Sequence, residues 1–331
     1  MPVSRARQRW SWPAARLLVV PLLLIGAAAT PVGAAVPVEP PGPALSVTDA
    51  DLDRALTCSG DLADADRTPV LLTPAFSTDK QSYGWNYLQS LPRAGYPTCS
   101  LSLPDRGYGD LQVAAEYVVA ATRRMHEAAG RPITLMGHQH GALNGLWALR
   151  FWPDVAPVVE DFIALATPFR GTATSALACR TLRSCPPAAW QIATGSAYLA
   201  ALDGPLPTGP SYTSIATVFD PLIVPQPRAS RLEGASNVLV QDVCPLRPVE
   251  HFAILGDHVA YSLVLDALQH EGPADRRRIS RLTCFRAGMP GLDASGLPRL
   301  VVAAGGAVTG ALTQVPATSV GQEPALADYA R

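Results

Sequence analysis

Charged residues are scarce in this sequence. Of its 331 residues, 16% are Asp, Glu, Lys or Arg, and the single lysine, Lys80, leaves arginine to carry nearly all the positive charge. Lys and Arg number 26 against 27 Asp and Glu, so the formal net charge is −1. A protein that binds nucleic acid through phosphate contacts needs a strongly basic surface. The charge balance excludes that class, and we expect no nucleic-acid partner.

No Cys-x-x-Cys pair or His/Cys cluster has the spacing of a zinc site. Aromatic residues are also few, at 7%. Hydrophobic residues nevertheless make up 48% of the chain. That share is enough for a folded core and excludes an intrinsically disordered chain. Ala, Val and Leu must supply most of the core, and the length fits one large domain or two of ordinary size.

The N-terminus has the pattern of a secretory signal peptide. Four arginines precede an apolar run over residues 17–29, and the small residues at 32–34 fit a cleavage site. The apolar run is short for a bilayer span. We therefore predict a signal peptide over 1–34, an extended lead-in rich in Pro and Ala over 35–50, and a secreted protein of the extracellular space or cell envelope.

Six cysteines follow the predicted cleavage site, and none precedes it. An even number in an exported chain favours disulfides over metal ligation. The spacing leaves their connectivity open, although Cys179 and Cys185 could pair locally.

Strands and helices alternate along the predicted domain. Apolar runs bounded by turn residues predict strands at 69–73, 97–103, 132–136, 161–166, 214–218 and 237–241. Helical periodicity predicts helices at 110–129, 142–152 and 259–269. This alternation favours a parallel sheet with helices on both faces. Residues 171–210 are predicted to leave the sheet, and the apolar stretch 297–312 is predicted to be a helix bordering an apolar pocket.

Gly137-His138-Gln139-His140-Gly141 joins the 132–136 strand to the following helix. In a nucleophile elbow, a sharp turn holds the middle residue in a strained conformation above the sheet, and flanking glycines let strand and helix approach. The helix N-terminus also favours negative charge nearby. The middle residue of that motif is serine, whereas here it is Gln139.

Together with this turn, several further stretches resemble the secreted serine lipases similar to Candida antarctica lipase B, over about residues 52–285. The matching stretches are 69–72, 147–154, 166–172, 190–196, 223–227 and 251–253. The resemblance implies a single α/β-hydrolase domain over 51–331, with a doubly wound, mostly parallel sheet and a lid-like excursion. It also implies hydrolysis of lipid ester bonds by a monomer that needs no cofactor.

The resemblance assigns roles to individual residues. Asp220 falls on the acid of the catalytic triad and His251 on its base, and the order elbow, Asp, His is that of α/β-hydrolases. The backbone N–H of His140 falls on one donor of the oxyanion hole. Phe76 falls on the second, where the family has a threonine, and Ser77 or Thr78 could compensate if the loop is shifted. The resemblance further implies the disulfides Cys58–Cys99 and Cys244–Cys284, and makes Cys179–Cys185 an addition.

Gln139 changes the chemistry that this site could perform. A triad needs an oxygen or sulfur nucleophile that an imidazole can deprotonate, and an amide supplies neither. Residues 135–166 contain no Ser, Thr or Cys, and the elbow-like Ala-Thr-Ser-Val-Gly at 317–321 follows no convincing strand. Removing the nucleophile of a serine protease costs on the order of 10⁶ in kcat. We therefore predict that serine-type hydrolysis is absent or very weak.

His138 and His140 raise two other hypotheses for the turn, metal binding and covalent catalysis by a histidine. A metal site needs three or more ligands, and no carboxylate follows at ligand spacing, so we expect no metal. His140 could itself serve as a nucleophile, because imidazole can form covalent intermediates, although nothing in the sequence favours it.

Three functions fit these observations. The first is an ester hydrolase of lipase type, which would need an unorthodox nucleophile or a water molecule activated by His251. The second is a secreted, non-catalytic relative that binds an acyl chain or ester, with transient contact to a lipid interface. The third is a structural envelope protein that keeps only the fold, and fold alone does not choose among them.

Overall fold

The computed structural model describes residues 42–63, 66–76, 80–292 and 297–331. The chain divides into two units, Met1–Val38 and Glu39–Arg331, and every helix and strand below belongs to the second. The predicted signal peptide and residues 35–41 of the predicted lead-in lie outside the described residues. Residues 42–48 form no helix or strand, and the first helix begins at Asp49.

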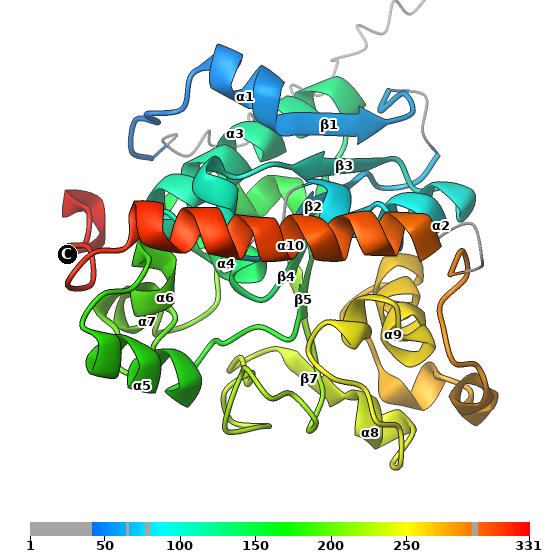
Figure 1. The fold of residues 1–331 in the computed structure, drawn as a ribbon. Helices are drawn as coiled ribbons and strands as arrows, with labels where there is room; N and C mark the ends of the chain where they lie inside the picture. The colour runs from blue at the N-terminus through cyan, green and yellow to red at the C-terminus, as the bar shows by residue number, and fades with distance from the viewer. Residues whose placement is uncertain (1–41, 64–65, 77–79, 293–296) are drawn as a thin grey trace, which may run out of the picture. The chain divides into compact units, whose positions relative to one another are not determined.

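A seven-stranded sheet in the order β1-β3-β2-β4-β5-β6-β7 forms the centre of the described fold (Figure 1). Every neighbouring pair is parallel except β1 with β3. The strands are β1 (Leu56–Ser59), β2 (Val70–Thr73), β3 (Thr98–Leu101), β4 (Ile133–His138), β5 (Val159–Leu165), β6 (Ser211–Ala216) and β7 (Ser236–Leu239). The expectation of a doubly wound, mostly parallel sheet is confirmed.

Each predicted strand overlaps one of the strands β2 to β7. β6 lies earlier than predicted, at Ser211–Ala216 instead of 214–218. β1 was not predicted, because its four residues are half-buried or exposed and give neither an apolar run nor an alternating pattern. It is held at the edge by pairing with β3 and by the disulfide between Cys58 and Cys99.

The three predicted helices are present and cover both faces of the sheet. α3 (Leu111–Ala129) and α4 (His140–Phe151) pack on one face, and α9 (His258–Gln269) packs on the other. Asp110 caps the start of α3, and Gly130 ends it in the left-handed conformation. α4 begins two residues earlier than predicted, directly after Gln139.

The remaining helices are short, except for α10. They are α1 (Asp49–Ala55), α2 (Tyr87–Arg93), α5 (Ala173–Leu182), α6 (Pro187–Gln191), α7 (Ala197–Ala201), α8 (Val240–Val243) and α10 (Leu297–Thr318). α5, α6 and α7 form the predicted excursion between β5 and β6. Short 3₁₀ segments lie at Lys80–Tyr83, Pro104–Gly107, Ala156–Val158, Ala253–Leu255, Arg276–Arg278, Arg281–Phe285 and Asp328–Ala330.

α10 is apolar but exposed. It packs against the 3₁₀ segments that follow β2 and β3, and Arg106 donates a hydrogen bond to the carbonyl of Gly306 at 3.1 Å. Within the described residues, Pro298–Thr318 is the one helical stretch long and apolar enough to cross a membrane by length and composition, with mean hydropathy 1.4. Val301 and Leu312 are 64% and 73% exposed, so this helix contributes little to the core.

Three disulfides join the six cysteines as Cys58–Cys99, Cys179–Cys185 and Cys244–Cys284. These are the pairings that the local spacing and the resemblance led us to expect. The first ties the edge strand β1 to β3, and the second closes the turn after α5. The third ties the segment after α8 to the 3₁₀ segment at Arg281–Phe285.

Candidate active site

The turn between β4 and α4 holds Gln139 in a strained backbone conformation. Its φ and ψ are 53° and −126°, a region that residues with side chains rarely adopt. Such strain costs on the order of 1–3 kcal/mol and persists where the surrounding structure enforces it. The backbone N–H of Gln139 donates to the carbonyl of Leu165 at 2.9 Å, which ties the turn to β5. The expected elbow geometry is present.

The two glycines of the turn are required by close backbone contacts. A Cβ on Gly137 would lie 2.3 Å from the backbone nitrogen of Ala142, and a Cβ on Gly141 would lie 2.3 Å from the carbonyl oxygen of Thr73. Neither backbone neighbour can move without displacing a strand or a helix. The glycines therefore let α4 start directly against the ends of β2 and β4.

His251 and Asp220 form a buried hydrogen-bonded pair. His251 Nδ1 lies 2.7 Å from Asp220 Oδ2, and both side chains are fully buried. The other oxygen of Asp220 accepts backbone N–H groups from Leu222 at 2.9 Å and Ile223 at 2.8 Å. An ionised carboxylate only accepts hydrogen bonds, so His251 carries its proton on Nδ1. Its Nε2 then presents a lone pair, as in a base that Asp orients.

His138 places this pair beside the turn. Its Nε2 lies 3.1 Å from the carbonyl oxygen of His251, and the two imidazole rings are 4.7 Å apart between centroids. Burial, and then the nearby His251, hold the pKa of His138 well below 6.5. A neutral His138 can donate to that carbonyl. It therefore ties the backbone of His251 to the residue that precedes Gln139 in the chain.

His140 and Phe76 lie together on the other side of the turn. Their ring centroids are 4.4 Å apart in an edge-on arrangement, and Phe76 also stacks on Tyr108 at 5.2 Å. Burial lowers the pKa of His140 to about 3, so this imidazole is neutral. Neither ring nitrogen of His140 nor the side-chain amide of Asn144, one turn later on α4, has a hydrogen-bond partner among the described residues.

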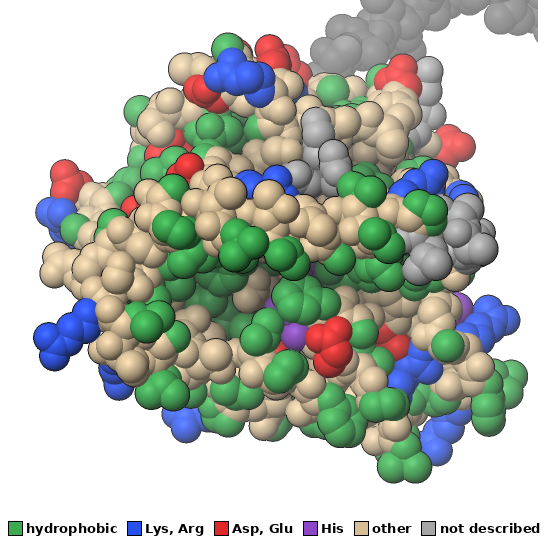
Figure 2. Space-filling model, in the orientation of Figure 1, with side chains coloured by type: hydrophobic (Ala, Val, Ile, Leu, Met, Phe, Trp, Pro, Cys, Tyr) green, Lys and Arg blue, Asp and Glu red, His purple; other side chains and the backbone are tan. Residues whose placement is uncertain are grey.

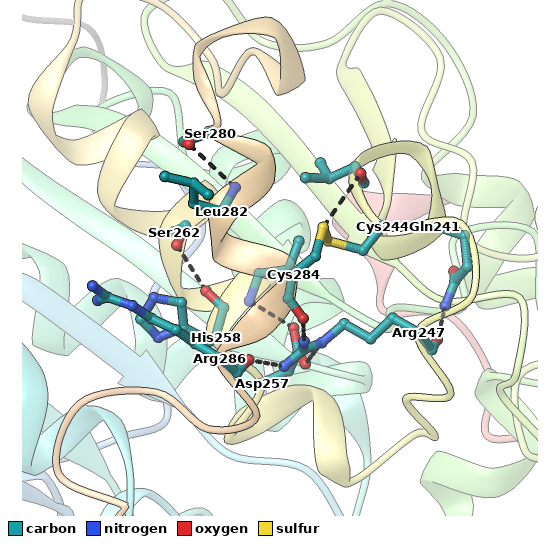
Figure 3. The surroundings of a disulfide bond; sticks show 12 residues. Gln241, Cys244, Arg247, Asp257, His258, Ser262, Ser280, Leu282, Cys284 and Arg286 are labelled. Carbon is teal, nitrogen blue, oxygen red and sulfur yellow. Dashed lines mark hydrogen bonds and ion pairs between the residues drawn. A yellow bond between two sulfur atoms is a disulfide. The ribbon is translucent and has the colours of Figure 1, made fainter.

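The His251 loop is anchored by contacts that sequence reasoning missed. Arg247, 10% exposed, forms an ion pair with Asp257, 2% exposed, and the other Asp257 oxygen caps the start of α9. Arg247 also donates to the carbonyl of Cys284 at 3.2 Å, beside the disulfide to Cys244 (Figure 3). The loop is therefore fixed on both sides of His251. No sequence motif marks the Arg247–Asp257 ion pair, because the two residues come into contact only when the loop between them folds.

A cavity of about 720 Å³ adjoins the same loop. Its apolar lining includes Trp85, Phe252, Leu292 and Leu300, the last from α10. Figure 2 shows a hollow beneath α10, with apolar side chains around it and histidine atoms within it. The stretch 297–312 thus borders an apolar cavity as predicted. Residues of the 171–210 excursion line a different cavity, of about 380 Å³.

Other candidate residues lie apart from this cluster. Ser77 and Thr78 are outside the described residues. Ser319, in the elbow-like stretch 317–321, follows the end of α10 and donates its hydroxyl to the carbonyl of Val315 at 2.6 Å. Across the described ranges, no group of three or more His, Cys, Asp or Glu side chains could hold a metal ion. His138 faces His251 whereas His140 faces Phe76.

Comparisons with known proteins concern the chain and its fold as a whole. No protein-family model matches the sequence. Lipase B of Pseudozyma antarctica is 30% identical over 237 residues, which cover 69% of each protein. The crystal structure of Aspergillus fumigatus lipase B has a TM-score of 0.80 and 27% identity, covering 92% of this chain and 77% of that one. Mature lipase BlEst2 of Bacillus licheniformis, at 17% identity and a TM-score of 0.53, shares the fold over 64% of this chain and 97% of its own.

Proposed function

Because this chain belongs to the lipase B family of α/β-hydrolases, we propose that it binds acyl esters of lipids in a lipase framework whose serine-type hydrolysis is absent or very weak. One observation carries the proposal. Gln139 occupies the strained position of the elbow, while the buried His251–Asp220 pair stands intact beside it. In this proposal His251 has the role of a triad base, and the side chain of residue 139 offers no hydroxyl or thiol for it to deprotonate.

The chemistry of the amide supports this reading. Acyl transfer by a triad requires a hydroxyl or thiol that loses its proton to the imidazole as it attacks. The carboxamide of Gln139 has neither, and its nitrogen lone pair is delocalised into the carbonyl. Residue 139 keeps the strained backbone of a nucleophile elbow, but it lacks the nucleophilic side chain that this turn exposes in the motif.

The residues assigned to the oxyanion hole also support weak or absent hydrolysis. We assign the backbone N–H of His140, at the start of α4, as one donor to an ester carbonyl oxygen. Phe76, assigned to the second donor, has no side-chain hydroxyl, and its ring packs on that of His140. An ester could therefore bind through fewer donors than in an active lipase, which favours binding over turnover.

A second candidate function is slow ester hydrolysis in which His251 activates a water molecule. The observation that favours it is Nε2 of His251, which is buried and has no hydrogen-bond partner among the described residues. With its proton held on Nδ1 by Asp220, this nitrogen can accept a proton from water.

We further propose that the protein is secreted, acts as a monomer and meets its ligand at a lipid–water interface. Three disulfides fit an oxidising compartment. The exposed valines and leucine of α10, together with Phe252 at the rim of the cavity, give an apolar surface near the site. Residues 300–322 contain no charged side chain. Val308→Asp with Leu312→Asp is expected to reduce flotation of the chain with phosphatidylcholine vesicles.

The test of the main proposal compares binding with turnover. The purified mature chain and His251→Ala are assayed for nitrophenolate release from butyrate and octanoate nitrophenyl esters, and for binding of a long-chain methyl ester by calorimetry. We expect binding of the methyl ester and a release rate that differs little between the two proteins. A parent rate that His251→Ala abolishes would support the second candidate instead. Failure to bind any ester would contradict both.

A further inference from the structure

Three large apolar side chains are exposed around the disulfide between Cys244 and Cys284. Leu246 is 94% exposed, Phe285 88% and Leu282 73%, and we call these three the disulfide patch. The disulfide brings their two segments together, with 5.6 Å between the Cα atoms of its cysteines. Burial of such side chains is favourable, and a group of them on a surface marks contact with a partner or a membrane.

The backbone that carries the disulfide patch is fixed by further contacts. The side chain of Arg247 donates to the backbone carbonyls of Cys284 and Arg286 at 3.2 and 2.7 Å, which joins the two segments a second time (Figure 3). The 3₁₀ segment at Arg281–Phe285 is capped by Ser280 and packs on α9. The fold therefore enforces the exposure of the three apolar side chains.

The charge around the disulfide patch is positive. Five of the eleven residues 276–286 are arginine, and residues 276–292 contain no Asp or Glu. Three of these arginines form ion pairs, which are Arg276 with Asp242, Arg277 with Asp275 and Arg278 with Asp266. Arg281 and Arg286 are exposed and have no acidic partner among the described residues. In Figure 2, hydrophobic and basic side chains gather at the lower right, around α8 and α9.

Exposed apolar side chains flanked by arginine match a surface that is anionic at its face and apolar beneath. We propose that the disulfide patch, with Arg281 and Arg286, docks the protein on an anionic lipid surface, such as a bilayer that contains phosphatidylglycerol. Phe285 and the two leucines enter the boundary between headgroups and acyl chains. The two guanidinium groups pair with lipid phosphates.

The disulfide patch adjoins the cavity beside the His251 loop. Arg247 and Ala287, which line that cavity, are the chain neighbours of Leu246 and Arg286. Docking therefore sets the cavity close to the lipid from which an acyl ligand comes. The inference rests on the proposed function for that ligand, and it adds the charge of the lipid surface. α10 gives no such preference, because residues 300–322 contain no charged side chain.

Flotation of the purified mature chain with vesicles tests the inference. One set of vesicles is phosphatidylcholine alone, and the other also contains phosphatidylglycerol. We expect the partition coefficient to be about 10- to 30-fold higher on the second set, because each arginine near an anionic surface contributes a factor of about five. The preference should fall as salt is added, since salt screens exposed charges.

Three variants assign the effect to the patch. Arg281→Gln with Arg286→Gln should abolish the preference for phosphatidylglycerol and leave partition onto phosphatidylcholine unchanged. Phe285→Ser should weaken binding to both sets about tenfold, because it removes an inserted apolar ring. Arg180→Gln with Arg228→Gln removes the same charge from exposed positions elsewhere and is the matched control, which should keep the preference. All these side chains are exposed, so thermal unfolding should be unchanged.

The outcomes separate this inference from the function on which it rests. Equal partition onto the two sets of vesicles, or an equal loss in the control variant, overturns the docking surface. A dimer in solution that Phe285→Ser dissociates also overturns it, because a second copy would then cover the patch. Calorimetry with a long-chain methyl ester tests the proposed function without vesicles. No ester binding alongside an intact phosphatidylglycerol preference overturns the proposed function and leaves the docking surface standing.

Discussion

Replacing Gln139 by serine should convert this framework into an ester hydrolase. The turn already holds position 139 at φ 53° and ψ −126°, and the His251–Asp220 pair is already formed. Loss of the nucleophile accounts for on the order of 10⁶ in kcat. One weakened oxyanion donor costs ~10²–10³, and Phe76 supplies no hydroxyl. We therefore expect Gln139→Ser to gain about 10³- to 10⁴-fold in kcat, or about 4–5.5 kcal/mol of transition-state stabilisation.

The assay measures nitrophenyl butyrate hydrolysis together with labelling by a phosphonate. Gln139→Ser should bind one phosphonate per chain at position 139, whereas the parent and Gln139→Ala should remain unlabelled. Adding His251→Ala to the serine variant should remove the gain. A folded Gln139→Ser protein with no gain in rate and no label would refute the reasoning, because it would mean that the site cannot present a nucleophile to His251.

Three further changes test the structural argument. Burial raises the pKa of the Asp161 carboxyl from 3.8 to about 7. Below about pH 4 this buried carboxyl is neutral in the folded and the unfolded chain, and as the pH rises toward 7 the folded parent loses stability because only the unfolded chain ionises freely. The free energy of unfolding of Asp161→Asn, measured with urea, should therefore rise relative to that of the parent by up to about 4 kcal/mol across that range. Arg247→Met leaves the carboxylate of Asp257 buried without its ion pair and should cost about 3–5 kcal/mol in the same assay. Gly141→Ala drives a Cβ against backbone oxygens and should lower the free energy of unfolding by about 3 kcal/mol.

Each of these has a matched control at an exposed position. Asp203→Asn, in a surface pair with Arg170, should show no comparable gain between pH 4 and 7. Arg276→Met breaks a surface pair with Asp242 and should change stability by less than about 1 kcal/mol. Gly305→Ala adds a Cβ that meets nothing within 4 Å on α10 and should stabilise by about 0.5–1 kcal/mol. Equal effects at the buried and exposed positions would contradict the packing argument.

Much of the fold was predictable because its signals are local. The fully buried run of β2 and the helical period of α3 are visible in the order of residues, and Gly130 ends α3 where predicted. β1 escaped prediction because it is an edge strand of four residues, stabilised by its neighbour and a disulfide. Its existence depends on pairing partners distant in the chain, which no short window contains.

The sequence by itself determined that no hydroxyl or thiol stands at the middle of the elbow, because the identity of residue 139 and the glycines around it are local facts. The tertiary structure alone decided how the site is held. Asp220 sets the tautomer of His251 across 2.7 Å, His138 supports its carbonyl, and Arg247 anchors its loop to Asp257. These contacts join segments whose meeting depends on the path of the folded chain. Hydrogen bonds act over a few ångströms of space rather than along the sequence.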